Sequence, residues 1–115
     1  MRVVIIEDEW MIADDIAATL TQAGCAVVGV AGSIQKALSL IDEVSCDVAI
    51  LDANLDGAGA EPVARALRRR QVPFLVLSGY ASEERSEELA DAPFLAKPYS
   101  GSELVATVQA LAGSR

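Results

Sequence analysis

Residues 47–57, with the sequence DVAILDANLDG, decide how we interpret the rest of the chain. The run from Val48 to Leu51 is apolar at every position, which is typical of a strand buried on both faces of a parallel sheet. The run ends at Asp52, and Asp56-Gly57 marks a loop soon afterwards. In an open parallel sheet, ligands and chemistry collect at the carboxyl ends of the strands. We therefore predict that Asp52 lies at a functional edge of such a sheet.

Similar apolar runs recur along the chain, and helical patterns fill the intervals between them. We predict strands over residues 2–6, 26–31, 48–51, 73–77 and 94–96. Apolar periodicity and capping signals predict five helices: one through Ile12–Leu20 with a stop at Gly24, then 34–44, 62–70, 83–90, and one from a capping box at Ser100 to about residue 112. Strands that alternate with helices form a parallel sheet with helices on both faces, joined by right-handed crossovers. The sequence therefore predicts the α/β fold class.

The composition limits the classes of protein to which this chain can belong. The chain has 115 residues, of which 52% are hydrophobic, so one domain with a real core fits. No apolar run is long enough to span a membrane, and acids at residues 7–9 come too early for a secretory signal. We therefore expect a soluble, cytoplasmic protein, with Cys25 and Cys46 as reduced core thiols. The net charge of −8 argues against nucleic-acid binding, and the absence of His excludes His-based catalysis.

Polar residues follow the ends of four predicted strands. They are Glu7 and Asp8 after the first strand, Asp52 after the third, Ser78 after the fourth and Lys97 after the fifth. These ends converge on one edge of a doubly wound sheet. Two carboxylates about 5 Å apart repel by roughly 3 kcal/mol at an effective dielectric near 20, so three of them need a counter-charge. Lys97 supplies one positive charge, and ligands that are all oxygen select Mg²⁺ or Mn²⁺.

The identity, order and spacing of these residues resemble those of the receiver domain of bacterial two-component response regulators, the CheY-like superfamily. The resemblance covers the whole chain. The stretches PF at 73–74, SGY at 78–80 and PFLAKPY at 93–99 are also similar to the short, often single-domain "FAT GUY" receivers. The resemblance implies a flavodoxin-like, doubly wound five-stranded sheet with strand order 2-1-3-4-5 and five flanking helices, the fourth short or irregular. It implies that residues 1–115 form one receiver domain without an output domain.

The resemblance further implies a phosphoaccepting signalling module of a two-component phosphorelay. Asp52 would accept a phosphoryl group from a phosphohistidine of a sensor histidine kinase or a histidine phosphotransfer protein. Mg²⁺ or Mn²⁺ would be held by Glu7, Asp8, Asp52 and the backbone carbonyl of Asn54. Only self-catalysed phosphotransfer and autodephosphorylation would occur, so we do not expect an enzyme with an external substrate.

The resemblance also implies contacts to the phosphoryl group and a switch. The phosphoryl contacts would come from the side chains of Lys97 and Ser78 and from the backbone amides of Ala53 and Gly79. Phosphorylation would draw Ser78 inward and move residues 78–82, with a response in the face formed by helix four, strand five and helix five. Phe94, three residues before Lys97, would turn inward in response, although an ordinary core role is equally consistent with its position. Because helix four is short, we expect a monomer or a weak dimer.

Other interpretations remain open from the sequence. The chain could be a receiver-like adaptor that works without phosphorylation, a phosphatase with an aspartyl nucleophile, or more distantly a flavodoxin-like cofactor carrier. Trp10 and Met11 lie off the apolar stripe of their helix, where they are either simply exposed or a docking point for a partner's helical bundle. Arginines crowd the end of the helix over 62–70, where they either complement the helix dipole and aid solubility or form a binding patch.

Overall fold

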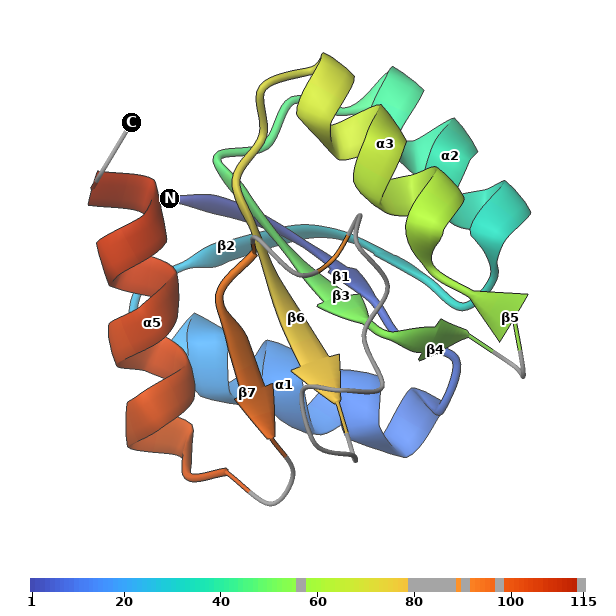
Figure 1. The fold of residues 1–115 in the computed structure, drawn as a ribbon. Coiled ribbons are helices and arrows are strands. Elements are labelled where there is room, and N and C mark those ends of the chain that lie inside the picture. Colours follow the sequence, from blue (N-terminus) through green and yellow to red (C-terminus); the bar gives the residue numbers. More distant parts are fainter. Residues whose placement is uncertain (56–57, 79–88, 90–91, 97–98, 114–115) are drawn as a thin grey trace.

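A computed structural model describes residues 1–55, 58–78, 89, 92–96 and 99–113 (Figure 1). Its central sheet consists of five strands: β1 (Arg2–Ile6), β2 (Ala26–Ala31), β3 (Val48–Asp52), β6 (Phe74–Ser78) and β7 (Phe94–Ala96). The strands lie in the order β2-β1-β3-β6-β7, and every neighbouring pair is parallel. Counted along the chain, this is the order 2-1-3-4-5, so the predicted α/β class and sheet topology are confirmed.

Helices cover both faces of the sheet. The helices are α1 (Trp10–Gln22), α2 (Ile34–Glu43), α3 (Glu61–Arg69) and α5 (Gly101–Gly113). Figure 1 shows α1 and α5 on one face and α2 and α3 on the other. The predicted helix over 83–90 lies outside the described residues, apart from the buried Leu89.

Side chains alternate between the two faces of the sheet and fill two core layers. On β1, Val3 and Ile5 contribute to the layer beneath α1 and α5, whereas Val4 and Ile6 contribute to the layer beneath α2 and α3. Every residue of β3 is buried, as its continuous apolar run predicts. Cys25 belongs to the first layer and Cys46 packs against the second, and no disulfide bond joins them.

The helix termini follow the signals in the sequence. The Ser33 hydroxyl accepts a hydrogen bond from the backbone N–H of Lys36 at 3.2 Å and so caps α2. Ser100 and Glu103 form the predicted capping box, because each side chain accepts from the other's backbone N–H at 3.1 Å. After α1, Gly24 adopts a φ of +93°, a conformation that glycine tolerates and other residues rarely adopt. Because all five strands of the central sheet are parallel, their carboxyl ends lie at one edge, which we call the carboxyl edge.

The structure also contains an element that the sequence did not predict. β4 (Asn54–Leu55) and β5 (Ala58–Gly59) pair antiparallel where only a loop was expected. Two-residue strands are too short to show an alternating pattern, so the periodicity of the sequence carries no trace of them. Among the described residues, no helix combines the length and the apolarity that crossing a membrane requires.

Candidate functional site

Three carboxylates meet at the carboxyl edge of the sheet. Glu7 and Asp8 follow the last residue of β1, and Asp52 is the last residue of the neighbouring strand β3. One carboxylate oxygen from each residue lies within 4.8 Å of the other two. The predicted convergence of these acids is therefore confirmed, while the role of each one stays a prediction.

Burial makes it costly to keep a negative charge on all three carboxylates of this cluster. Only 2% of Glu7 and 7% of Asp52 are exposed, whereas Asp8 is partly exposed. Burial, followed by a hydrogen bond with Asp52 and by negative charge on Asp52, raises the pKa of Glu7 from 4.5 to about 7. The backbone N–H of Glu9, which donates to Glu7 Oε2 at 3.2 Å, opposes this rise. Without a bound cation, Glu7 therefore keeps its proton to a higher pH than an ordinary glutamate does.

The donor set fits a hard divalent cation. All three candidate ligands are carboxylates, the oxygen donors that Mg²⁺ and Mn²⁺ prefer in proteins. Burial is the main cause of the raised pKa of Glu7, and the negative charge on Asp52 adds to it; a divalent cation would oppose both effects. Glu7, Asp8 and Asp52 are thus the described residues that could hold such an ion.

The fourth strand brings a hydroxyl to the same edge. Ser78 is the last residue of β6, one position later than the sequence pattern placed the end of this strand, and only 5% of it is exposed. Its neighbour Leu77 pairs with Asp52 across the sheet, and Ser78 itself pairs with Ala96 on β7. Lys97, which follows Ala96 in the sequence, lies outside the described residues.

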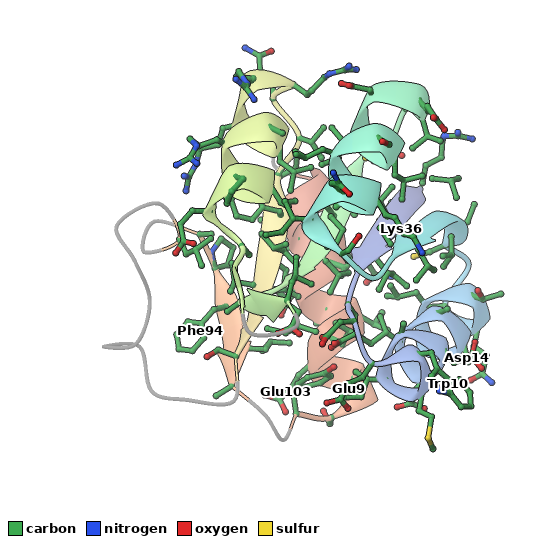
Figure 2. The ribbon with its side chains drawn as sticks, turned by 90° about the vertical axis from the view of Figure 1, so that its right-hand side faces the viewer. Glu9, Trp10, Asp14, Lys36, Phe94 and Glu103 are labelled. Carbon is green, nitrogen blue, oxygen red and sulfur yellow. The ribbon has the colours of Figure 1, made fainter. Side chains whose placement is uncertain are left out.

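The other residues predicted to contact the metal or the phosphoryl group, or to take part in the switch, lie at or near the same edge or outside the described residues. The backbone N–H of Ala53 donates a hydrogen bond to the carbonyl of Leu77 at 2.9 Å, so in this conformation the amide is bonded to strand β6. Asn54 begins β4, and Gly79 lies in the part of the chain that the structure does not describe. Phe94, labelled in Figure 2, is partly buried and packs against the layer beneath α2 and α3. The structure therefore tests none of the roles predicted for these residues.

Tyr99 is a neighbour of the site that the sequence interpretation missed. It is partly buried against the core layer beneath α1 and α5. Burial raises the pKa of its hydroxyl, and negative charge on Glu7, Asp15 and Asp52 raises it further. The signal in the sequence was its place just after the fifth strand, where the chain returns to the carboxyl edge.

Two large apolar side chains lie exposed at the start of α1. Trp10 is 74% exposed and Met11 67% exposed, directly after the acidic residues 7–9. Figure 2 shows Trp10 at the same end of the molecule as Glu9. The prediction that both side chains lie off the buried stripe of the helix is confirmed.

Comparison with known proteins places this site in a family. Residues 3–109 match the family model of the response regulator receiver domain. The chain belongs to the response regulator receiver family. This receiver domain is 33% identical, over 99% of its length, to transcriptional regulatory protein PdtaR of Mycobacterium tuberculosis. The match covers 57% of PdtaR, and the chain spans about half the length of the curated relatives it matches.

Solved structures share the fold over nearly the entire domain. SdrG from Sphingomonas melonis Fr1 is 32% identical with a TM-score of 0.83, and the match covers 97% of this chain and 95% of that one. The signal receiver domain of NarL from Mycobacterium tuberculosis is 29% identical with a TM-score of 0.85, covering 99% and 97%. These matches identify a receiver domain of two-component signalling, whereas the narrower likeness to the "FAT GUY" receivers stays a prediction.

Proposed function

We propose that this receiver domain is a phosphoaccepting module of a two-component phosphorelay, with Asp52 as the phosphoacceptor. The observation that carries the proposal is the convergence of Glu7, Asp8 and Asp52 within 4.8 Å of one another at the carboxyl edge. Membership of the family supplies the class of reaction. The clustering of the three carboxylates supports their part in it.

The chemistry is transfer of a phosphoryl group between two nucleophiles. A carboxylate oxygen of Asp52 attacks the phosphorus of a phosphohistidine on the partner, and a P–O bond forms as the P–N bond breaks. The imidazole nitrogen keeps the electron pair of the broken bond. Mg²⁺, when bound, neutralises charge on the moving group, and its ligands would be Glu7, Asp8, Asp52 and the backbone carbonyl of Asn54. Hydrolysis of the acyl phosphate later restores the carboxylate of Asp52.

Further groups would stabilise the phosphoryl oxygens. Lys97 would act as a point charge, and the hydroxyl of Ser78 would donate a hydrogen bond. The backbone amides of Gly79 and Ala53 would also donate, and the amide of Ala53 would first have to share or break its bond to the carbonyl of Leu77. Attraction of Ser78 toward the phosphoryl group would move residues 78–82, and inward rotation of Phe94 would transmit the change.

The partner would be a sensor histidine kinase or a histidine phosphotransfer protein. The organisation we propose is a single receiver domain over residues 1–115, in the cytoplasm, as a monomer or weak dimer without nucleic acid. A phosphorylation-independent adaptor is the main alternative, and retention of full signalling by an Asp52→Asn variant would favour it. A phosphatase would normally place a second acid two residues after the nucleophile, and Asn54 occupies that position.

The direct test is the intact mass of the domain after incubation with acetyl phosphate and Mg²⁺. We expect a gain of one phosphoryl group that disappears when EDTA is present during the incubation. Acetyl phosphate supplies the same phosphoryl group without a protein partner, so the test isolates the chemistry of the domain. A folded domain whose mass does not change would contradict the proposed function.

Exposed Trp10 provides a test of partner docking. Large aromatic side chains often contribute most to an interface, and their truncation commonly costs 2 kcal/mol or more. We expect Trp10→Ala to slow phosphotransfer from a cognate phosphohistidine protein by about tenfold or more, with labelling by acetyl phosphate unchanged. Val30, 52% exposed on the edge strand β2, is the matched control, and Val30→Ala should leave both rates unchanged. Equal rates for Trp10→Ala and the wild type would exclude docking at this position.

A further inference from the structure

The far end of α3 carries a cluster of arginines that the site described above does not use. Arg65, Arg68 and Arg69 lie on α3, Arg70 is its C-terminal cap, and all four are exposed. They are four of only nine Lys and Arg residues in the chain. Because the chain has a net charge of −8 and the four arginines contribute +4, the remaining residues carry −12. We call these four residues the arginine cluster, a cationic island on an anionic protein.

The arginine cluster lies at the opposite edge of the sheet from the carboxylates. Figure 1 shows that α3 runs against the direction of the strands, so its C-terminal end reaches the edge where the strands begin. Arg68 lies over Phe74, the first residue of β6, whereas Ser78 at the other end of β6 belongs to the carboxyl edge. A molecule bound to the arginine cluster would therefore leave the phosphoacceptor accessible.

Arg68 and Arg70 make contacts with side chains of neighbouring elements. The Arg68 guanidinium lies 5.2 Å from the centroid of the Phe74 ring, within range of a cation–π interaction. Arg70 Nη2 lies 2.8 Å from Asp42 Oδ1 on α2. Arg65 and Arg69 are four residues apart, so they lie one above the other on the same side of the helix. Anchored guanidinium groups lose less conformational freedom when they bind a ligand.

Helix stability alone does not account for this arrangement. The helix dipole favours cations only in the last turn, but Arg65 is the fifth residue of a nine-residue helix. Like charges four residues apart, as at Arg65 and Arg69, destabilise an isolated helix. The cluster also contains no Lys, and the planar guanidinium of Arg binds both oxygens of a carboxylate at once. These features favour a surface that recognises carboxylates.

We propose that the arginine cluster is a docking surface for an acidic peptide segment, rich in Asp and Glu, of a partner protein. Charge complementarity selects an anionic partner, and the bidentate geometry of arginine suits carboxylates. A nucleic acid fits this surface less well, because its regularly spaced phosphates would extend beyond the small cluster onto a surface that carries net negative charge. This docking is separate from phosphorylation of Asp52.

The test is fluorescence anisotropy of a fluorescein-labelled peptide of twelve Asp and Glu residues, titrated with the full 115-residue chain at low salt. We expect Arg65→Gln/Arg69→Gln to weaken binding about tenfold, since each exposed charge pair contributes modestly. The control variant Arg2→Gln/Lys36→Gln removes the same charge at other elements and should change the affinity less than twofold. Arg68→Lys, which keeps the charge but loses the planar group over Phe74, should weaken binding several-fold.

Thermal unfolding of each variant confirms that the fold is intact before affinities are compared. Equal losses for Arg65→Gln/Arg69→Gln and the control would show that only the net charge matters and would overturn the proposal. So would the absence of peptide binding by the wild type at low salt. Tighter binding of a single-stranded RNA of equal charge than of the peptide would identify the wrong class of partner and would overturn it too.

Discussion

Asp52→Asn is expected to abolish the gain of a phosphoryl group and, at the same time, to stabilise the metal-free domain. The amide has no carboxylate oxygen to attack phosphorus, so incorporation should fall from one group to none. The gain in stability follows from the crowding at the carboxyl edge, where Asp52 raises the pKa of Glu7. Removing one of the negative charges should raise the free energy of unfolding at pH 8 by about 1–3 kcal/mol.

Two measurements check this pair of effects. Intact mass after acetyl phosphate and Mg²⁺ reports the chemistry, and urea unfolding in EDTA at pH 8 reports stability. The matched control is Asp14→Asn, an exposed acid on α1 that loses the same charge outside the carboxylate cluster. It should accept a phosphoryl group normally and change the unfolding free energy by less than about 0.5 kcal/mol. Phosphorylation of the Asp52→Asn variant would show that another residue is the acceptor.

Metal-free stability is expected to fall as the pH rises through 7. The folded domain holds a proton on Glu7 with a pKa of about 7, whereas the unfolded chain releases it near 4.5. Between these values the folded state binds more protons, so the free energy of unfolding decreases with rising pH. The stabilising contribution is fully present below pH 4.5 and is lost above pH 7. The expected loss over the whole range is on the order of 3 kcal/mol.

Urea unfolding in EDTA at several pH values between 5 and 8.5 measures this loss, and Glu7→Gln is the informative variant. The variant cannot ionise at this position, so its unfolding free energy should vary less with pH and should exceed that of the wild type at pH 8. Mg²⁺ should stabilise the wild type more at pH 8 than at pH 6, because protons compete for the same carboxylate. A wild-type profile as flat as that of Glu7→Gln would show that Glu7 is ionised throughout this range.

The sequence predicted those features that local patterns encode. Continuous apolar runs located the strands, and the polar residues just after them, such as Asp52, located the carboxyl edge. The paired strands β4 and β5 were not predicted, because a strand of two residues shows no periodicity in the sequence. The raised pKa of Glu7 and the proximity of Tyr99 to the carboxylates were not predicted either, because both depend on groups that lie close in space but far apart along the chain. Which residues meet at a strand end is thus predictable, whereas how strongly they perturb one another is not.

The central sheet divides the interior into two compartments, one beneath α1 and α5 and one beneath α2 and α3. Among the described residues the buried apolar side chains form two separate clusters, so the energetic effects of substitutions on opposite faces should add nearly independently. A lineage of such domains can therefore remodel one compartment while the other retains its shape. The carboxylates at the carboxyl edge depend on the packing of both compartments, because β1 and β3, which position them, contribute side chains to each one.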